Sequence, residues 1–455
     1  MFVFYDFETT GTSPEFDQPI QFAAIRTDEE LNPVERINIR CRLAPHILPS
    51  PWALVVTGVN PQILNDPVLP SWYQFSETLR GLIVKWSPST WTGFNTLSFD
   101  EEFIRQTFYQ NLQPNLYETQ SNGNDRLDIM RLVYACWHFE QKSFQWPYNE
   151  KGRVSFRLDQ LAKINGFSQH NAHDALGDVE ATIYMAQLVR NNARTIWDKT
   201  LENRNKAAVL NKLQAGGVFE YIERFGASPP IAYLGTYCGS NTKNGSEIGF
   251  FRIGEFNPSD YLDASDSELD KVLEASPKAI FRIAVNKTPS LYEKIDLSPE
   301  LIKRAALISS RPDFQNRIGN ALARRYDKVE SREYVEQKIY DGFYSKNDKI
   351  LLEKFHSVGW ESKSELLKQI SDERLKILGE RILKYESPEL FSEQENLEVK
   401  IEIQRRWDNP ATNKESWTTF SIVEKQIDEI EQESALSDAK LEELKSFYAY
   451  KKTTA

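Results

Sequence analysis

Two carboxylates separated by one residue stand near the start of the chain, within residues 2–11 (Phe-Val-Phe-Tyr-Asp-Phe-Glu-Thr-Thr-Gly). The apolar run before them has strong strand preference. Because residues two apart in a strand point to the same face, Asp6 and Glu8 project side by side. Two adjacent carboxylates are costly to ionise unless a cation lies between them, and hard oxygen ligands suit Mg²⁺ or Mn²⁺. The alternative is a pair of solvated surface charges.

Further acidic residues and a histidine have positions that suit the same site. Asp100 stands at the start of a predicted helix, where it caps the helix, faces the metal site as another carboxylate, or does both. Asp178 lies in the first turns of a helix predicted over 179–190. We expect His173 on the preceding loop, where it approaches the metals without ligating them, as a general base does. The alternative for His173 is a surface histidine that caps the helix, and Asp174 is the expected N-cap.

Two arginines are candidates for binding phosphate. Arg105 falls one turn beyond Asp100, and Arg157 stands at the start of another predicted helix. Guanidinium groups bind phosphate oxygens with charge-assisted hydrogen bonds. The loop 142–153 mixes aromatic and cationic side chains, which is the composition of a surface that contacts a single nucleic-acid strand and also of an ordinary polar loop.

The elements that must position these residues follow an α/β pattern. A first strand is predicted from Phe2 through Glu8, ended by Thr9, Thr10 and Gly11, and further strands are predicted over 18–27 and 34–43. The helices that follow predict a domain with a mixed sheet. Further helices are predicted over 73–84, 126–139 and 201–213. Short apolar runs with glycine-rich turns predict β structure over 216–300, and helical patterns resume over 300–338 and after residue 344.

Length and composition restrict the class of protein. A chain of 455 residues with 40% hydrophobic residues is long enough for two to four globular domains. The net charge of −11 argues against binding nucleic acid over the whole surface and leaves room for a local basic channel. No membrane span or signal peptide is evident. Three distant cysteines without a Cys-x-x-Cys motif favour a reducing cytoplasm and argue against a thiolate zinc site.

Together these motifs resemble the DnaQ-like superfamily of 3′–5′ exonucleases, in its DEDDh subgroup. The resemblance rests on the Asp-Phe-Glu-Thr-Thr-Gly-Thr start and on Asn-Ala-His-Asp-Ala-Leu-Gly-Asp at 171–178. Other segments are similar to one family in particular, bacterial exonuclease I: residues 17–28, 155–158, 203–206, 283–289 and 340–345. The likeness covers most of the chain and is loosest over the last hundred residues or so.

The resemblance implies a three-domain architecture. We expect an RNase H-like (DnaQ-like) exonuclease domain over 1–195, an SH3-like β-containing domain over 196–338 and a C-terminal helical domain over 339–455. In the family these domains surround single-stranded DNA. The family also binds the acidic C-terminal tail of single-stranded-DNA-binding protein, and we expect a cytoplasmic monomer with both partners.

The resemblance also implies an activity, a cofactor and roles for the candidate residues. The activity is 3′–5′ hydrolysis of single-stranded DNA to 5′-mononucleotides, in DNA repair and recombination. The cofactor is Mg²⁺, as two ions that Mn²⁺ can replace. The implied metal ligands are Asp6, Glu8 and Asp178; Asp100 completes the acidic set, His173 is the general base, and Glu8, Arg157 and Arg105 contact the substrate.

Two other functions compete with this one. An RNA 3′-trimming nuclease would use the same active site, but the long C-terminal region argues against it, because such relatives are generally little more than the nuclease domain. A catalytically silent DNA-binding or scaffold protein is the second alternative. The intact acidic set argues against a scaffold. Loss of the Asp178 carboxylate distinguishes the scaffold from the enzyme: if the protein is an enzyme, cleavage of DNA disappears while binding of DNA remains.

Overall fold

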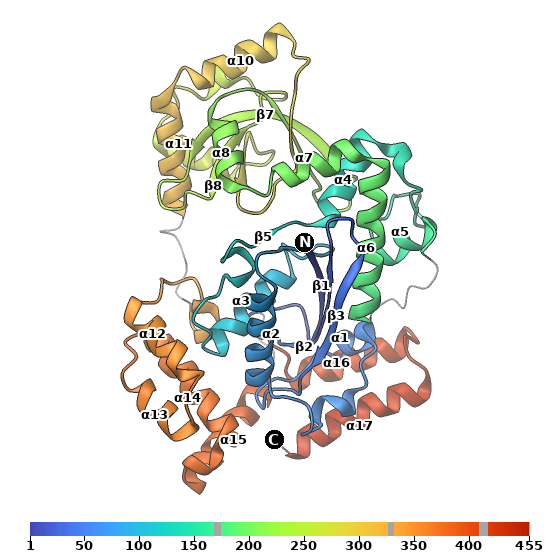
Figure 1. The fold of residues 1–455 in the computed structure, drawn as a ribbon, viewed down its shortest axis with the longest axis vertical. Coiled ribbons are helices and arrows are strands. Elements are labelled where there is room, and N and C mark those ends of the chain that lie inside the picture. Colours follow the sequence, from blue (N-terminus) through green and yellow to red (C-terminus); the bar gives the residue numbers. More distant parts are fainter. Residues whose placement is uncertain (168–173, 326–331, 409–416, 455) are drawn as a thin grey trace.

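The computed structural model describes residues 1–167, 174–325, 332–408 and 417–454. The chain forms two five-stranded sheets, here called the first and the second sheet, and a group of C-terminal helices (Figure 1). The second sheet lies at the top of Figure 1, the first in the middle and the C-terminal helices at the bottom. This arrangement confirms the predicted α/β class and its succession of α/β, β-containing and helical regions.

The first sheet is mixed, as the sequence predicted. Its strand order is β3-β2-β1-β4-β5; β1, β2 and β3 pair antiparallel, whereas β4 is parallel to β1 and β5 is parallel to β4. The strands are β1 (Phe2–Thr9), β2 (Pro19–Thr27), β3 (Pro33–Arg40), β4 (Thr90–Thr92) and β5 (Asp125–Arg126).

Alternation along β1 divides its side chains between two hydrophobic cores. Val3, Tyr5 and Phe7 belong to the core that also contains residues of α2, α3 and the C-terminal helices. Phe2 and Phe4 belong to the core formed with α4, α5 and α6. Because side chains alternate with a period of two, the even-numbered residues that follow Phe4 face the side of α6.

Helices cover both faces of the first sheet, with α2 and α3 on one side and α6 on the other (Figure 1). The helix predicted over 126–139 begins later, since Arg126 belongs to β5 and the Asp128 carboxylate accepts the N–H of Met130 as N-cap. The helices are α1 (Pro51–Thr57), α2 (Trp72–Trp86), α3 (Asp100–Gln110), α4 (Ile129–Phe139), α5 (Leu158–Ile164) and α6 (Ala175–Asn192).

The second sheet is antiparallel throughout, in the order β10-β6-β7-β8-β9. It confirms the predicted β-containing region, and its SH3-like character stays a prediction. The helix predicted over 201–213 is broken at Asn203, whose side-chain amide donates to the carbonyls of Pro289 and Leu291. The elements are α7 (Arg194–Glu202), α8 (Lys206–Gln214), β6 (Phe219–Glu223), β7 (Ile231–Ser240), β8 (Glu247–Phe251), α9 (Asp266–Glu274), β9 (Ile280–Ala284), β10 (Leu291–Glu293), α10 (Pro299–Ser309) and α11 (Pro312–Arg324).

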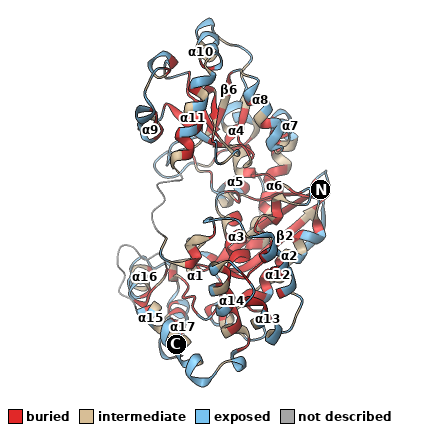
Figure 2. Ribbon diagram, turned by 90° about the vertical axis from the view of Figure 1, so that its left-hand side faces the viewer, coloured by how far each residue is buried: buried red, intermediate tan, exposed pale blue. Residues whose placement is uncertain are grey.

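The C-terminal helices share one hydrophobic core with the first sheet. Figure 2 shows the buried residues gathered in the sheets and on the sides of the helices that pack against them. No helix in the described ranges is both long and apolar enough to cross a membrane. The helices are α12 (Lys346–Phe355), α13 (Trp360–Leu367), α14 (Glu373–Glu386), α15 (Glu393–Asp408), α16 (Phe420–Gln432) and α17 (Asp438–Thr454).

Candidate active site

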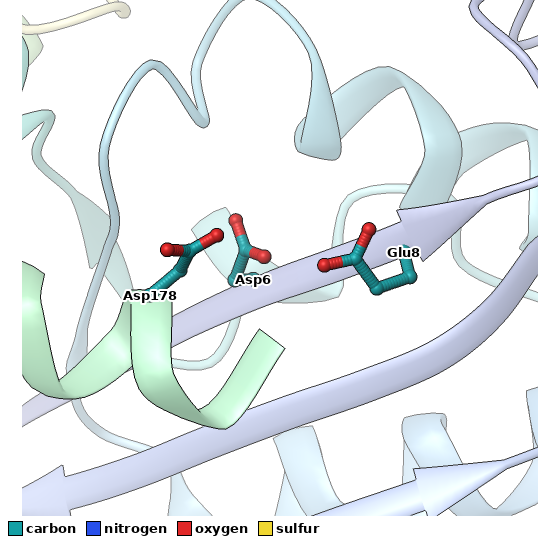
Figure 3. A group of neighbouring side chains, drawn as sticks. All are labelled: Asp6, Glu8 and Asp178. Carbon is teal, nitrogen blue, oxygen red and sulfur yellow. The ribbon is translucent and has the colours of Figure 1, made fainter. Parts of the chain in front are cut away.

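Three carboxylates meet where β1 passes the start of α6 (Figure 3). Asp6 and Glu8 lie two residues apart on β1, and Asp178 lies in the first turn of α6. One carboxylate oxygen of each residue lies within 4.8 Å of those of the other two. The strand period predicted that Asp6 and Glu8 are neighbours, whereas the packing of α6 on β1 brings Asp178 beside them.

The environment of these carboxylates opposes their ionisation. Burial, followed by the charges of Asp100, Glu8 and Asp178, raises the pKa of Asp6 well above its ordinary value. Burial and the charges of Asp178 and Asp100 raise the pKa of Glu8 to about 9. Carboxylates crowded in this way bind a cation that relieves both their repulsion and their loss of hydration. Three oxygen donors of this kind therefore fit a hard divalent ion.

Asp100 stands beside this group but is not one of its three members. It is the first residue of α3, and the N-cap position, one of the alternatives predicted for it, belongs to Phe99. Its buried carboxylate instead accepts the backbone N–H of Phe7, at 3.1 Å. Burial raises the pKa of Asp100 to about 8. Asp100 thus adds to the negative charge around Asp6 and Glu8, and its role as a further ligand stays a prediction.

His173 lies outside the described residues, so its proposed role as general base stays a prediction. Asp174, the first described residue after it, occupies the N-cap position of α6 as expected. Its side chain does not cap that helix. The Asp174 carboxylate accepts a hydrogen bond from the Gln21 side chain, 3.1 Å away on β2, which ties the start of α6 to the sheet.

A cavity of about 570 Å³ opens beside Asp178, and Arg157 lines it. The Arg157 side chain is 62% exposed and forms an ion pair with Asp159, 3.0 Å away. Arg153, from the loop 142–153, lines the same cavity. So does Arg224, which could not be predicted from the sequence because it follows β6 and reaches the cavity only through the packing of the second sheet.

Arg105 has a different environment. Its side chain is only 8% exposed and forms ion pairs with Glu102 at 2.7 Å and Glu101 at 3.5 Å. The guanidinium also lies 5.2 Å from the centre of the Tyr117 ring. Arg105 lines neither cavity beside the carboxylates, and a contact between this arginine and the substrate stays a prediction.

A second cavity, of about 550 Å³, opens beside Glu8. Its walls include Trp52 of α1 and Trp417, which precedes α16. Gln426 of α16 holds α1 in place, because its side-chain oxygen accepts hydrogen bonds from the Ser50 hydroxyl at 2.8 Å and from the backbone N–H of Trp52 at 3.3 Å. These residues could not be predicted from the sequence, since no local pattern links positions so far apart in the chain.

Two family models match the chain. The model described as "Exonuclease" matches residues 3–186, the region of the first sheet and the three carboxylates. The model described as "Exonuclease I C-terminal domain" matches residues 333–454, which include the C-terminal helices. The two matches lie on either side of the second sheet.

Individual proteins match over nearly the whole length. Exodeoxyribonuclease I of Haemophilus influenzae is 29% identical over 407 residues, which cover 82% of this chain and 84% of the relative. The crystal structure of Escherichia coli exonuclease I in complex with a dT13 oligonucleotide superposes with a TM-score of 0.85 and 23% identity, covering 100% of this chain and 99% of the other. A crystal structure of SSB/exonuclease I with the inhibitor CFAM has the same TM-score, identity and coverage.

Proposed function

Because the chain belongs to the exonuclease I family, we propose that it hydrolyses single-stranded DNA from the 3′ end and releases 5′-mononucleotides, with Mg²⁺ as cofactor. The observation that carries this proposal is the group formed by Asp6, Glu8 and Asp178, whose carboxylate oxygens lie within 4.8 Å of one another. The raised pKa values of Asp6 and Glu8 and the oxygen donors of all three residues suit divalent ions, and the adjoining cavities leave room for a strand.

In this proposal Asp6, Glu8 and Asp178 hold two Mg²⁺ ions, which Mn²⁺ can replace, and Asp100 completes the acidic set. When bound, the ions lower the pKa of water and stabilise the charge that develops on the phosphate. His173 accepts the proton of the attacking water. The water oxygen bonds to phosphorus as the bond from phosphorus to the leaving 3′ oxygen breaks.

Substrate binding is assigned to Glu8 and Arg157, and to Arg105 if binding frees it from its carboxylate partners. The exposed guanidinium of Arg157 beside Asp178 is well placed to bind a phosphate of the strand. Glu8 faces the second cavity, which suits the terminal nucleotide. The E. coli structure with dT13 supports single-stranded DNA as the ligand.

The wider setting is proposed on the same premise. The SSB/exonuclease I structure supports single-stranded-DNA-binding protein as a partner. We further propose that the acidic C-terminal tail of that protein is the segment that binds. We place the protein in the cytoplasm, as a monomer that acts in DNA repair and recombination. The domain boundaries proposed are 1–195 for the exonuclease domain, 196–338 for the SH3-like domain and 339–455 for the helical domain.

The direct test is digestion of a 5′-labelled single-stranded DNA with Mg²⁺, beside RNA of the same sequence and duplex DNA, with Asp178→Ala as control. Progressive shortening of the single-stranded DNA alone, absent in the variant, is expected. Preferential loss of RNA would place the protein among the RNA-trimming enzymes. Binding without cleavage of any substrate would favour a scaffold.

A further inference from the structure

We propose that Arg224 binds a backbone phosphate of the DNA strand upstream of the bond that is cleaved. The inference rests on the proposed function and extends the binding site beyond the first sheet. Arg224 directly follows β6, whereas the three carboxylates belong to β1 and α6. The second sheet would thus supply a side chain to the substrate groove itself.

The first observation is the composition of the cavity beside Asp178. Three arginines line it: Arg153 and Arg157, which precede α5, and Arg224. The protein as a whole carries a net charge of −11, so a cluster of guanidinium groups next to a carboxylate site is a local departure from the charge of the rest of the chain. A polyanionic strand is attracted by such a local cluster, whatever the total charge.

The second observation is the way Arg224 is held. Its guanidinium lies 5.0 Å from the centre of the Phe156 ring, and its Nε donates to the carbonyl of Ser228 at 3.0 Å. Phe156 is buried and lines the same cavity. Within the described part of the chain no carboxylate forms a salt bridge with Arg224, whereas Asp159 pairs with Arg157. Neutral partners therefore orient the Arg224 guanidinium, and no ion pair compensates its positive charge. A guanidinium held in this way is suited to binding a phosphate.

The third observation is the contrast with the cavity beside Glu8. Among the described residues that line that cavity there is no lysine or arginine, and its walls include Trp52, Phe99 and Trp417. In a strand cut at its last linkage, the only phosphate of the terminal nucleotide is the one at the cleaved bond, which the carboxylate site would hold through its metal ions. Every linkage upstream adds a further phosphate that needs a positive partner. The arginine-lined cavity therefore matches the upstream strand, and the aromatic cavity matches the terminal nucleoside.

The test measures binding of a single-stranded oligonucleotide in EDTA, so that cleavage does not interfere, at several salt concentrations. We expect Arg224→Ala to weaken binding about tenfold, as for the loss of a hydrogen bond to a charged group. The slope of log K against log salt should fall in magnitude by about 0.7, the share of one phosphate contact in single-stranded DNA. Arg224→Lys keeps the charge and should retain most of the slope.

Arg311→Ala is the control, because it also removes an arginine from the region of the second sheet. Arg311 lies between α10 and α11 and pairs with Asp263 and Asp313. Helix α10 lies at the top of Figure 1, far from β1 and α6. A second arm places a single neutral methylphosphonate at each linkage in turn. At one linkage, the methylphosphonate should weaken binding of the oligonucleotide to the wild type. At that same linkage it should cause no further loss of affinity in the Arg224→Ala variant.

Two results would overturn the proposal. One is an Arg224→Ala variant with the affinity and salt slope of Arg311→Ala; the other is a methylphosphonate pattern that is unchanged by the substitution. Cleavage of unmodified DNA by the wild type, measured separately with Mg²⁺, tests the proposed function. A wild type that cleaves, together with either of these results, rejects only the role of Arg224; a wild type that neither binds nor cleaves rejects both.

Discussion

The carboxylate of Asp100 accepts a hydrogen bond from the backbone N–H of Phe7, the residue between Asp6 and Glu8. This bond fixes the start of α3 against β1 at the point where the acidic pair projects. Asp100 therefore has two effects at once: it holds the strand that presents the cluster, and it adds a charge that opposes ionisation of Asp6 and Glu8.

These two effects can be separated by substitution. Asp100→Asn keeps an oxygen that accepts the Phe7 N–H, whereas Asp100→Ala leaves this buried donor without its partner. We expect the alanine variant to be less stable than the asparagine variant by about 1–3 kcal/mol. Denaturant unfolding of both variants without metal measures the difference. Equal stabilities would mean that the hydrogen bond contributes little.

Asp178→Asn is expected to have opposite effects on activity and on stability. Cleavage of single-stranded DNA should fall at least about a hundredfold, because a ligand that supports charge stabilisation is lost. The metal-free variant should unfold at a higher temperature than the wild type, since one source of repulsion is removed. Asp198→Asn, which alters an exposed carboxylate of α7, is the control. It should change neither the cleavage activity nor the unfolding temperature. An Asp178→Asn protein less stable than the wild type would argue against a repulsive cluster.

The stability of the metal-free protein should fall as the pH rises. The pKa of Glu8 is raised from 4.5 to about 9 and that of Asp100 from 3.8 to about 8. The folded state therefore binds more protons than the unfolded state between about pH 4 and pH 9, so these groups favour folding less as the pH increases through that window.

Thermal unfolding with EDTA and with Mg²⁺, at pH 5 and pH 8.5, checks this expectation. Mg²⁺ should stabilise the protein more at pH 8.5, where the carboxylates are more readily ionised and available for binding. Asp178→Asn should show a shallower dependence on pH. If Mg²⁺ raised the unfolding temperature more at pH 5 than at pH 8.5, the assignment of the metal ligands would be contradicted.

Glu101 is expected to be critical for stability rather than for binding. It is buried, with its carboxylate 2.7 Å from Arg126 and 3.5 Å from Arg105. Although burial would raise its pKa, the two arginines outweigh that effect and hold it below the ordinary value. Glu101→Gln leaves buried positive charge uncompensated and should lower the free energy of unfolding by about 3–5 kcal/mol.

Glu102→Gln supplies the comparison for Glu101, because Glu102 also pairs with Arg105 but is 27% exposed. The Glu102→Gln substitution should lower the free energy of unfolding by less than about 1 kcal/mol. Chemical denaturation of the two variants measures both values. Similar costs for both substitutions would show that burial does not set the strength of this network.

Much of the site could be predicted from local patterns. The alternation of apolar and acidic residues in β1 places Asp6 and Glu8 on one face, because the period of a strand is a property of the backbone. Asp178 at the start of α6 followed in the same way from a helical pattern. The helix predicted over 126–139 was placed too early at its start, since β5 pairs with a strand distant in sequence and overrides local preference.

Tertiary structure alone decided how these pieces meet. The sequence by itself determined the acidic residues and the elements that carry them. Only the family resemblance grouped Asp178 with Asp6 and Glu8; local patterns do not show that α6 packs on β1. Nor could the sequence place Arg105 among Glu101, Glu102 and Tyr117, or Arg224 beside the cavity. Backbone periodicity is encoded within a few residues, whereas burial, charge repulsion and the walls of a cavity arise only when distant segments pack together.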